Sequence, residues 1–155
     1  MTGATGMTGV TGPTGPTVTA NNLSAASTTI RSVPFLGVIP VSDVTSNGSA
    51  IKNNNGVITL APNQTYSVNY NSVAFNSSIG TASAALALNG TALANIIPGT
   101  QSSQTGGAPN AQTNLSGGTI ISTGGTSATV QLINSTIGFP SMNYQTTAVN
   151  VVKLA

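Results

Sequence analysis

The first segment of the chain repeats glycine with a strict period of three. The glycines are Gly3, Gly6, Gly9, Gly12 and Gly15, and each triplet ends in threonine, at Thr5, Thr8, Thr11, Thr14 and Thr17. Only glycine fits at the crowded axis of a collagen triple helix, which takes every third residue of each chain. Residues 1–17 are therefore predicted to be a collagen-like Gly-X-Thr segment. The alternative is a flexible Gly/Thr linker, but a linker has no reason to keep its phase over five triplets.

So few triplets cannot be expected to form a triple helix unaided, because each chain loses backbone entropy when it is ordered. The segment needs a neighbouring trimeric domain that holds three chains together, or it acts as an extended peptide that docks onto another subunit. Residues 18–32 are predicted to be a connector, with Asn21-Asn22 as a turn signal. Residues 33–155 are predicted to be the folded domain.

From Val33 onward the pattern is one of short strands and turns, and no stretch shows a capped apolar period of 3.6 residues. The run 82–88 is predicted to be a strand that ends at Leu88, and its hairpin partner is predicted to run from Thr91 to about Ile97, because Asn89-Gly90 is a strong hairpin signal. The other predicted strands are Val33–Val41, Val57–Leu60, Thr65–Phe75, Thr119–Ser122, Ala128–Ile133 and Tyr144–Leu154. Gly117-Gly118 is one of the predicted breaks, and 98–116 is predicted to be a long loop, either a Greek-key crossover or a binding loop. Eight to ten short strands indicate an all-β sandwich or barrel.

Charged residues make up only 3% of the chain, and histidine and cysteine are absent. Three scattered cations cannot neutralise several phosphates, so a nucleic-acid partner is not expected. Nor does any run approach the roughly 20 apolar residues of a membrane span. An uncharged Ser/Thr/Asn/Gln surface lacks long-range repulsion between copies, which favours self-association.

The same inventory argues against an enzyme. Asp43 is the only carboxylate side chain, so one chain cannot supply a general acid–base pair. A nucleophilic serine would lack a histidine base, and zinc or a transition metal would lack histidine and cysteine ligands. We therefore expect no catalytic residue, no cofactor and no metal ligand. Asp43 is expected to be an exposed turn residue; the alternative is that three copies meet at a trimer axis around one ion.

The chain resembles the BclA-like collagen-like glycoproteins of the spore surface (exosporium) in Bacillus and related spore formers. The resemblance rests on the Gly-X-Thr segment followed by GVITLAPNQTY at 56–66, AALALNGT at 84–91 and VNVVKLA at 149–155. It implies a C-terminal jelly roll similar to tumour necrosis factor (TNF) and C1q heads, assembled as a homotrimer. It also implies O-linked sugars on Thr5, Thr8, Thr11, Thr14 and Thr17. Long-stalked members have many more triplets and an N-terminal anchoring segment, and neither is visible here.

These features together predict a non-enzymatic structural protein of the bacterial spore surface that forms homotrimers. Its partners are expected to be its own copies and other spore-coat or exosporium proteins. A filament or hair-like nap is expected, with the N-terminal arm of one trimer contacting the next. The alternatives are a tip or adhesion head that binds a receptor or sugar, and the head of a phage tail fibre.

Apolar strand faces are predicted to form the core or the trimer interface. The candidate residues are Val68, Tyr70, Leu86, Leu88, Val149 and Val151. The two-residue period of a strand shows which of these share a face, but both the core and a neighbouring subunit would select the same apolar pattern.

Overall fold

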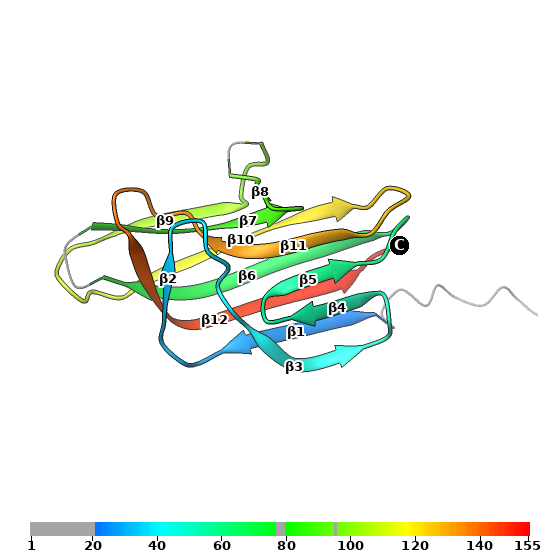
Figure 1. Ribbon diagram of the computed structural model, residues 1–155, viewed down its shortest axis with the longest axis horizontal. Helices are drawn as coiled ribbons and strands as arrows, with labels where there is room; N and C mark the ends of the chain where they lie inside the picture. Colours follow the sequence, from blue (N-terminus) through cyan, green and yellow to red (C-terminus); the bar gives the residue numbers. More distant parts are fainter. Residues whose placement is uncertain (1–20, 77–79, 95) are drawn as a thin grey trace, which may run out of the picture.

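The computed structural model describes residues 21–76, 80–94 and 96–155, which form twelve β-strands and no helix. Most strands run along the long axis of the molecule (Figure 1). In chain order they are β1 (Asn22–Ser27), β2 (Arg31–Pro34), β3 (Ser42–Asn47), β4 (Ile51–Asn54), β5 (Val57–Leu60), β6 (Thr65–Phe75), β7 (Gly80–Leu88), β8 (Thr91–Ala92), β9 (Gln101–Gly106), β10 (Thr113–Ser122), β11 (Ala128–Asn134) and β12 (Ser141–Lys153).

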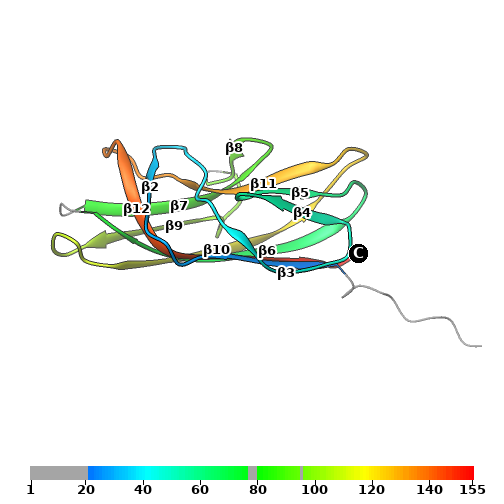
Figure 2. The ribbon, with the colours of Figure 1, turned by 60° about the horizontal axis from the view of Figure 1, so that its bottom comes forward.

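The strands form two antiparallel sheets that pack face to face (Figure 2). Sheet A has the order β10-β6-β12-β1-β3, and β2 pairs with the beginning of β12. Sheet B has the order β4-β5-β11-β7-β8, and β9 pairs with β7 on the opposite side from β11. Strands that are neighbours in space are mostly distant in sequence, as in the pairing of β1 with β12. This is the architecture of a jelly-roll sandwich, so the predicted all-β jelly-roll fold is confirmed.

The alternation of apolar and polar residues determines which face of sheet A meets sheet B. In β6, Tyr66, Val68 and Tyr70 are buried, and the residues between them lie on the opposite face. The register places Val68 beside Val151 and Tyr70 beside Val149, so β12 presents its own buried residues to the same side. Two neighbouring strands of matching period therefore build one continuous apolar layer.

Two Asn-Gly pairs form tight hairpin turns, as their sequence predicts. Asn55-Gly56 joins β4 to β5 with φ values of 50° and 92°, and Asn89-Gly90 joins β7 to β8 with φ values of 50° and 80°. Positive φ at both central positions is the requirement of a type I′ turn, which asparagine and glycine tolerate best. The strands Val57–Leu60 and Thr65–Phe75 also have their predicted bounds.

The predicted strand Val33–Val41 is wrong, because β2 ends at Pro34. A turn follows in which the Gly37 amide donates to the Pro34 carbonyl at 2.8 Å, and Leu36 takes a φ of 60°. The segment 35–40 then runs beside β11, where the Ile39 amide donates to the Leu132 carbonyl. The apolar residues of this stretch suggest a strand by their composition. The irregular segment that packs on β11 instead buries Ile39, while Phe35 and Leu36 remain about half exposed.

The predicted loop 98–116 is also wrong, because it contains β9 and the first residues of β10. Similarly, β1 and the beginning of β2 lie within the segment predicted to be a connector, and β3 and β4 are additional strands. The predicted partner of the 82–88 strand is far shorter than expected, because β8 has only two residues. The strands β1, β3 and β9 are poor in large apolar residues, so their local sequence gives little sign of them. After β8 the chain turns, and the Ile96 amide donates to the Leu93 carbonyl at 2.9 Å, which ends that strand early.

Gly117-Gly118 lies inside β10 and does not break a strand, contrary to the prediction. Gly117 lies opposite Tyr70 in the register, and a Cβ at Gly117 would stand 2.8 Å from Cε1 and 3.0 Å from Oη of that ring. A side chain here would also collide with the carbonyl oxygen of Gly99. The glycine is present because β10 passes close to a large buried ring.

Candidate functional site

The outer face of sheet A, turned away from sheet B, is made of uncharged side chains, most of them small. On the central strands these residues are Ser24, Ala26, Ser67, Asn69, Asn71, Ser116, Gly118, Ile120, Ala148, Asn150 and Val152, which we call the uncharged face. The register aligns Ser24, Asn150, Asn69 and Gly118 in one row across four strands. Ile120 is 63% exposed and Val152 is 36% exposed, which adds apolar area to this surface.

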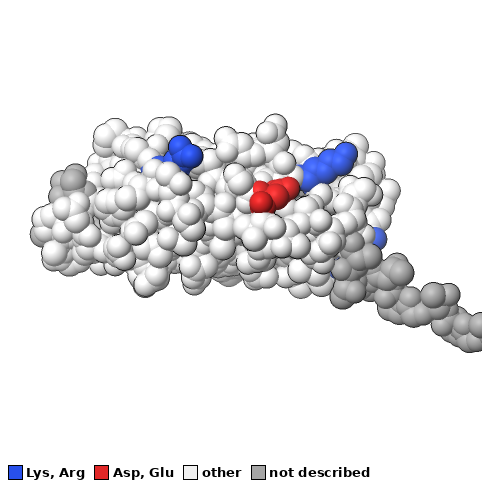
Figure 3. Space-filling model, turned by 90° about the horizontal axis from the view of Figure 1, so that it is seen from below, with Lys and Arg blue, Asp and Glu red and all other residues white. Residues whose placement is uncertain are grey.

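Charged side chains are almost absent from these strands. None lies on β1, β6 or β10, and β12 has only Lys153, near its end. Figure 3 shows an edge of the sandwich where one acidic and one basic group lie beside each other, and most of the remaining described surface in view is uncharged. Asp43 is exposed on strand β3, where its Oδ1 accepts a 2.8 Å hydrogen bond from Asn53 Nδ2. It is therefore a strand residue, and the prediction of a turn residue is wrong.

The structure places five of the six candidate core or interface residues inside a single chain. Val68, Tyr70, Leu86, Val149 and Val151 are at most 3% exposed, and Leu88 is partly buried against the same core. Side chains already enclosed between the two sheets of one chain cannot form the contact between chains. The opposite faces of β6 and β12 are exposed, and they present Asn69, Asn71 and Asn150.

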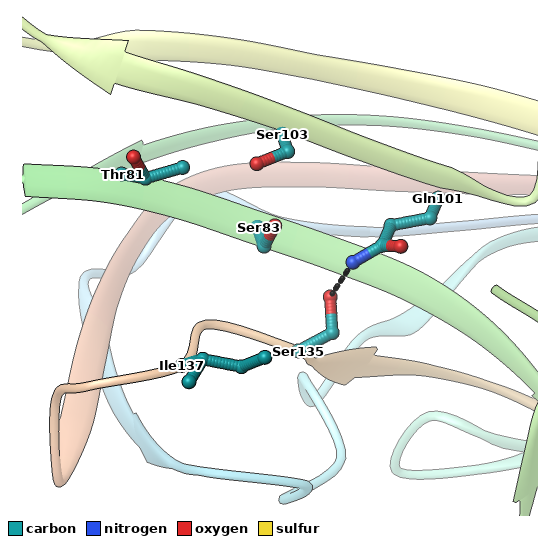
Figure 4. A pocket seen from close by; sticks show the side chains of 6 residues that line it. All are labelled: Thr81, Ser83, Gln101, Ser103, Ser135 and Ile137. Atoms are coloured by element: carbon teal, nitrogen blue, oxygen red, sulfur yellow. Dashed lines mark hydrogen bonds between the residues drawn. The ribbon is translucent and has the colours of Figure 1, made fainter. Parts of the chain in front are cut away.

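A second feature lies on the outer face of sheet B. A hollow of about 230 Å³ is lined by Thr81, Ser83, Gln101, Ser103, Ser135 and Ile137 (Figure 4), and we call it the hydroxyl-lined hollow. Thr81 and Ser83 come from β7, and Gln101 and Ser103 from β9. Ser135 and Ile137 come from the loop that follows β11. The register sets Ser83 directly beside Ser103 and places Thr81 one pair further along, so two strands present hydroxyl groups side by side.

Sequence reasoning missed this hollow because it missed β9. The stretch QSSQTG has no apolar residue, so it shows no alternation from which a strand or a face could be inferred. The signal that remained was the unbroken run of hydrogen-bonding side chains between Thr100 and Thr105, which is equally typical of a loop.

The tyrosines are the residues whose titration is most changed by folding. Burial raises the pKa of Tyr70 to about 12, and a backbone hydrogen bond at Ser102 opposes this with a smaller lowering effect. Burial also raises the pKa of Tyr144 and, less strongly, of Tyr66. The Tyr70 hydroxyl donates to the Ala84 carbonyl at 3.0 Å and the Tyr144 hydroxyl to the Ser83 carbonyl at 2.7 Å. Both bonds require the protonated phenol.

We expect the free energy of unfolding to be constant from about pH 5 to pH 9 and to fall above about pH 10. Histidine is absent, so no side chain changes charge in the first range. Above pH 10 the unfolded tyrosines lose protons that the native state retains, so the unfolded state binds fewer protons and stability decreases as pH rises. Urea titrations between pH 5 and pH 12 measure this profile. A decrease between pH 5 and pH 8 would contradict it.

Within residues 21–76, 80–94 and 96–155, no cluster of three His, Cys, Asp or Glu side chains could hold a metal ion. The same residues contain no helix long and apolar enough to cross a bilayer. The collagen-like glycines Gly3 to Gly15 and the threonines Thr5 to Thr17 lie outside the described residues. The chain enters the sandwich beside its C-terminal end, since the Lys153 amide donates to the Asn21 carbonyl at 3.0 Å.

No protein-family model and no curated protein matches the sequence. Solved structures do match the fold. The globular domain of zebrafish complement 1qA protein has a TM-score of 0.63 at 10% identity, covering 84% of this chain and 94% of that one. Murine APRIL at pH 5.0 has a TM-score of 0.60 at 14% identity, covering 86% and 98%. Eiger TNF from S. frugiperda has a TM-score of 0.57 at 12% identity, covering 87% and 94%. The described residues therefore have a TNF/C1q-like jelly-roll fold.

Proposed function

We propose that this chain is a non-enzymatic structural subunit of the bacterial spore surface that assembles as a homotrimer. The observation that carries the proposal is the uncharged face, a surface of mostly small uncharged side chains over four strands, opposite the apolar layer that fills the core. The TNF/C1q-like fold and the Gly-X-Thr segment support it. The assignment to a spore rests on the resemblance to the BclA-like glycoproteins.

The uncharged face suits association between identical copies. Small side chains let neighbouring chains approach closely, and no charge must be desolvated on β1, β6 or β10. The exposed Ile120 and Val152 lie in one row, on either side of Ser67. Their removal from water would contribute about 25 cal/mol for each Å² of apolar surface. Asn69 and Asn150, which are neighbours in the register, supply hydrogen-bonding groups at the centre of the face.

Trimerisation would also bring the Gly-X-Thr segments of three chains together. Residue 21, the first described residue, lies beside Lys153 at one end of the sandwich. In an assembly with threefold symmetry, three such segments would depart from the same end. They would then be held at high local concentration, which is the condition a short collagen-like segment needs.

Sedimentation velocity of the purified protein tests the trimer. The expected species has about three times the chain mass of 15.2 kDa. Asn150→Lys should convert it to monomer, because three buried ammonium groups would then face one another without partners. Gln104→Lys adds the same charge at an exposed position of sheet B and should leave the trimer intact. A monomeric parent protein, or equal effects of the two substitutions, would overturn the proposal.

The filament form of the proposal has its own test. If the N-terminal arm of one trimer contacts the next, deletion of residues 1–17 should abolish polymers seen by electron microscopy and leave discrete trimers. Filaments that persist without this segment would show that another surface connects the trimers. Discrete trimers of the intact chain would instead favour a tip or head domain.

A further inference from the structure

The hydroxyl-lined hollow has a property that the structural role does not use: its polar atoms are only partly paired. Ser83 Oγ and Ser103 Oγ make no hydrogen bond to any residue that the structure describes. Gln101 Nε2 donates to Ser135 Oγ at 3.2 Å, which leaves Gln101 Oε1 as an acceptor and the Ser135 hydroxyl proton as a donor. Figure 4 shows these side chains converging on one space from β7, β9 and the loop after β11.

The groups that line the hollow are positioned by the fold before any ligand arrives. Ser83 is 5% exposed, and its backbone amide and carbonyl both bond to Thr136 Oγ1, at 2.9 and 3.2 Å. Ser135 follows the last residue of β11, and its amide donates to the Ser83 carbonyl at 3.1 Å. Two of the hydroxyl groups are therefore fixed relative to each other by backbone contacts, so a ligand would not have to order them.

The chemistry of the lining selects the class of ligand. None of the six residues is charged, so a carboxylate, phosphate or ammonium group would lose hydration without gaining an opposite charge. Hydroxyl and amide side chains can both donate and accept, which suits a ligand whose own groups do both. Ile137 is 84% exposed at the rim and offers an apolar surface beside these polar groups.

The size of the hollow limits the ligand to a small one. Its volume of about 230 Å³ is below the roughly 300–1,000 Å³ of pockets for drug-sized molecules. We propose that the hollow binds one neutral sugar unit, with the Ser83, Ser103, Gln101 and Ser135 side chains bonded to sugar hydroxyl groups. The apolar C–H face of the ring would rest against Ile137. The structural subunit would then also recognise neutral glycans.

The test is an NMR titration of the ¹⁵N-labelled protein with the methyl glycosides of glucose, galactose, mannose and N-acetylglucosamine. We expect one of them to shift the amide signals of the hollow with an affinity of about 1–10 mM, as suits about a dozen heavy atoms. A second titration uses the same sugar without the methyl group. Because the methyl group mimics a glycosidic link, tighter binding of the methyl glycoside indicates a sugar linked in a glycan, and tighter binding of the unmodified sugar indicates a free sugar. Methyl glucuronide, which adds a carboxylate to the same ring, should bind at least about tenfold more weakly than methyl glucoside.

Two substitutions decide whether the signal belongs to this hollow. Ser83→Ala and Gln101→Ala each remove one hydrogen-bonding group and should weaken binding by about fivefold to tenfold. Ser46→Ala removes an exposed hydroxyl of β3, outside the hollow, and should leave binding unchanged. Unchanged thermal midpoints show that the variants are folded. The proposal is overturned if no glycoside shifts these amides at about 100 mM, far above the expected affinity, or if the hollow variants bind as well as Ser46→Ala.

Discussion

Asn134→Leu is expected to lower the free energy of unfolding by about 4 kcal/mol, because the leucine keeps the volume and loses a buried network of hydrogen bonds. Asn134 is fully buried at the end of β11. Its Nδ2 donates to the Val33 carbonyl at 2.9 Å, and its Oδ1 accepts from the Thr136 amide at 2.9 Å. The Oδ1 also lies 3.0 Å from the Tyr144 hydroxyl, whose one proton it shares with the Ser83 carbonyl. One amide side chain thus joins β2, β12 and the loop after β11.

The cost falls mainly on the groups left behind. The Tyr144 hydroxyl keeps its 2.7 Å bond to the Ser83 carbonyl, so it remains paired. The Thr136 amide and the Val33 carbonyl lose their Asn134 partner in the interior, and a buried polar group without a partner costs about 1–3 kcal/mol. Because Thr136 also positions Ser83, we expect the same substitution to disturb the hydroxyl-lined hollow.

Urea unfolding followed by tyrosine fluorescence and circular dichroism measures this effect. Asn54→Leu is the matched control, since Asn54 is exposed on β4 of sheet B and a surface substitution usually changes stability by less than about 0.5 kcal/mol. Similar losses in the two variants would show that the leucine itself, and not the lost network, is responsible. The Asn134 network would then contribute little to stability.

Gly117→Ala is expected to cost about 2 kcal/mol, although it adds only one methyl group. That methyl would meet the Gly99 carbonyl on one side and the Tyr70 ring on the other. Neither neighbour can yield easily. The Gly99 carbonyl accepts a 3.0 Å bond from the Gly118 amide, and the Tyr70 hydroxyl is bonded to the Ala84 carbonyl of sheet B. Relieving the contact must therefore shift either β10 or the packing between the sheets.

Thermal unfolding measures this effect, with an expected decrease in Tm of about 4–8 °C for a chain of this size. Gly125→Ala is the control, because nothing lies within 4 Å of a Cβ at Gly125. Its Tm should be unchanged or slightly higher, since alanine reduces the conformational freedom of the unfolded chain. Equal decreases in both variants would show that the loss reflects glycine replacement in general and not the contact with Tyr70.

Local sequence determined the elements whose signal is contained in a few neighbouring residues. The alternation in β6 and β12 predicted strands with one buried face, and Asn89-Gly90 predicted a turn because only a few residue types accept positive φ. The scarcity of charge by itself indicated a surface suited to self-association. These inferences depend on composition, on the alternation of side chains along a strand and on the backbone preferences of single residues. The alternation and the backbone preferences can be recognised within a stretch of about two to ten residues.

Tertiary structure decided the features that depend on partners far away in the chain. β1 is a strand because β12 and β3 supply its hydrogen bonds, more than 100 and about 20 residues away, and β9 is a strand because β7 offers an open edge. The apolar face of β6 could not be assigned to the core or to a neighbouring subunit until sheet B was in place over it. Strand pairing satisfies backbone hydrogen-bonding groups whatever the side chains are. The sequences of β1 (NLSAAS) and β9 (QSSQTG) therefore give almost no indication that these segments are strands.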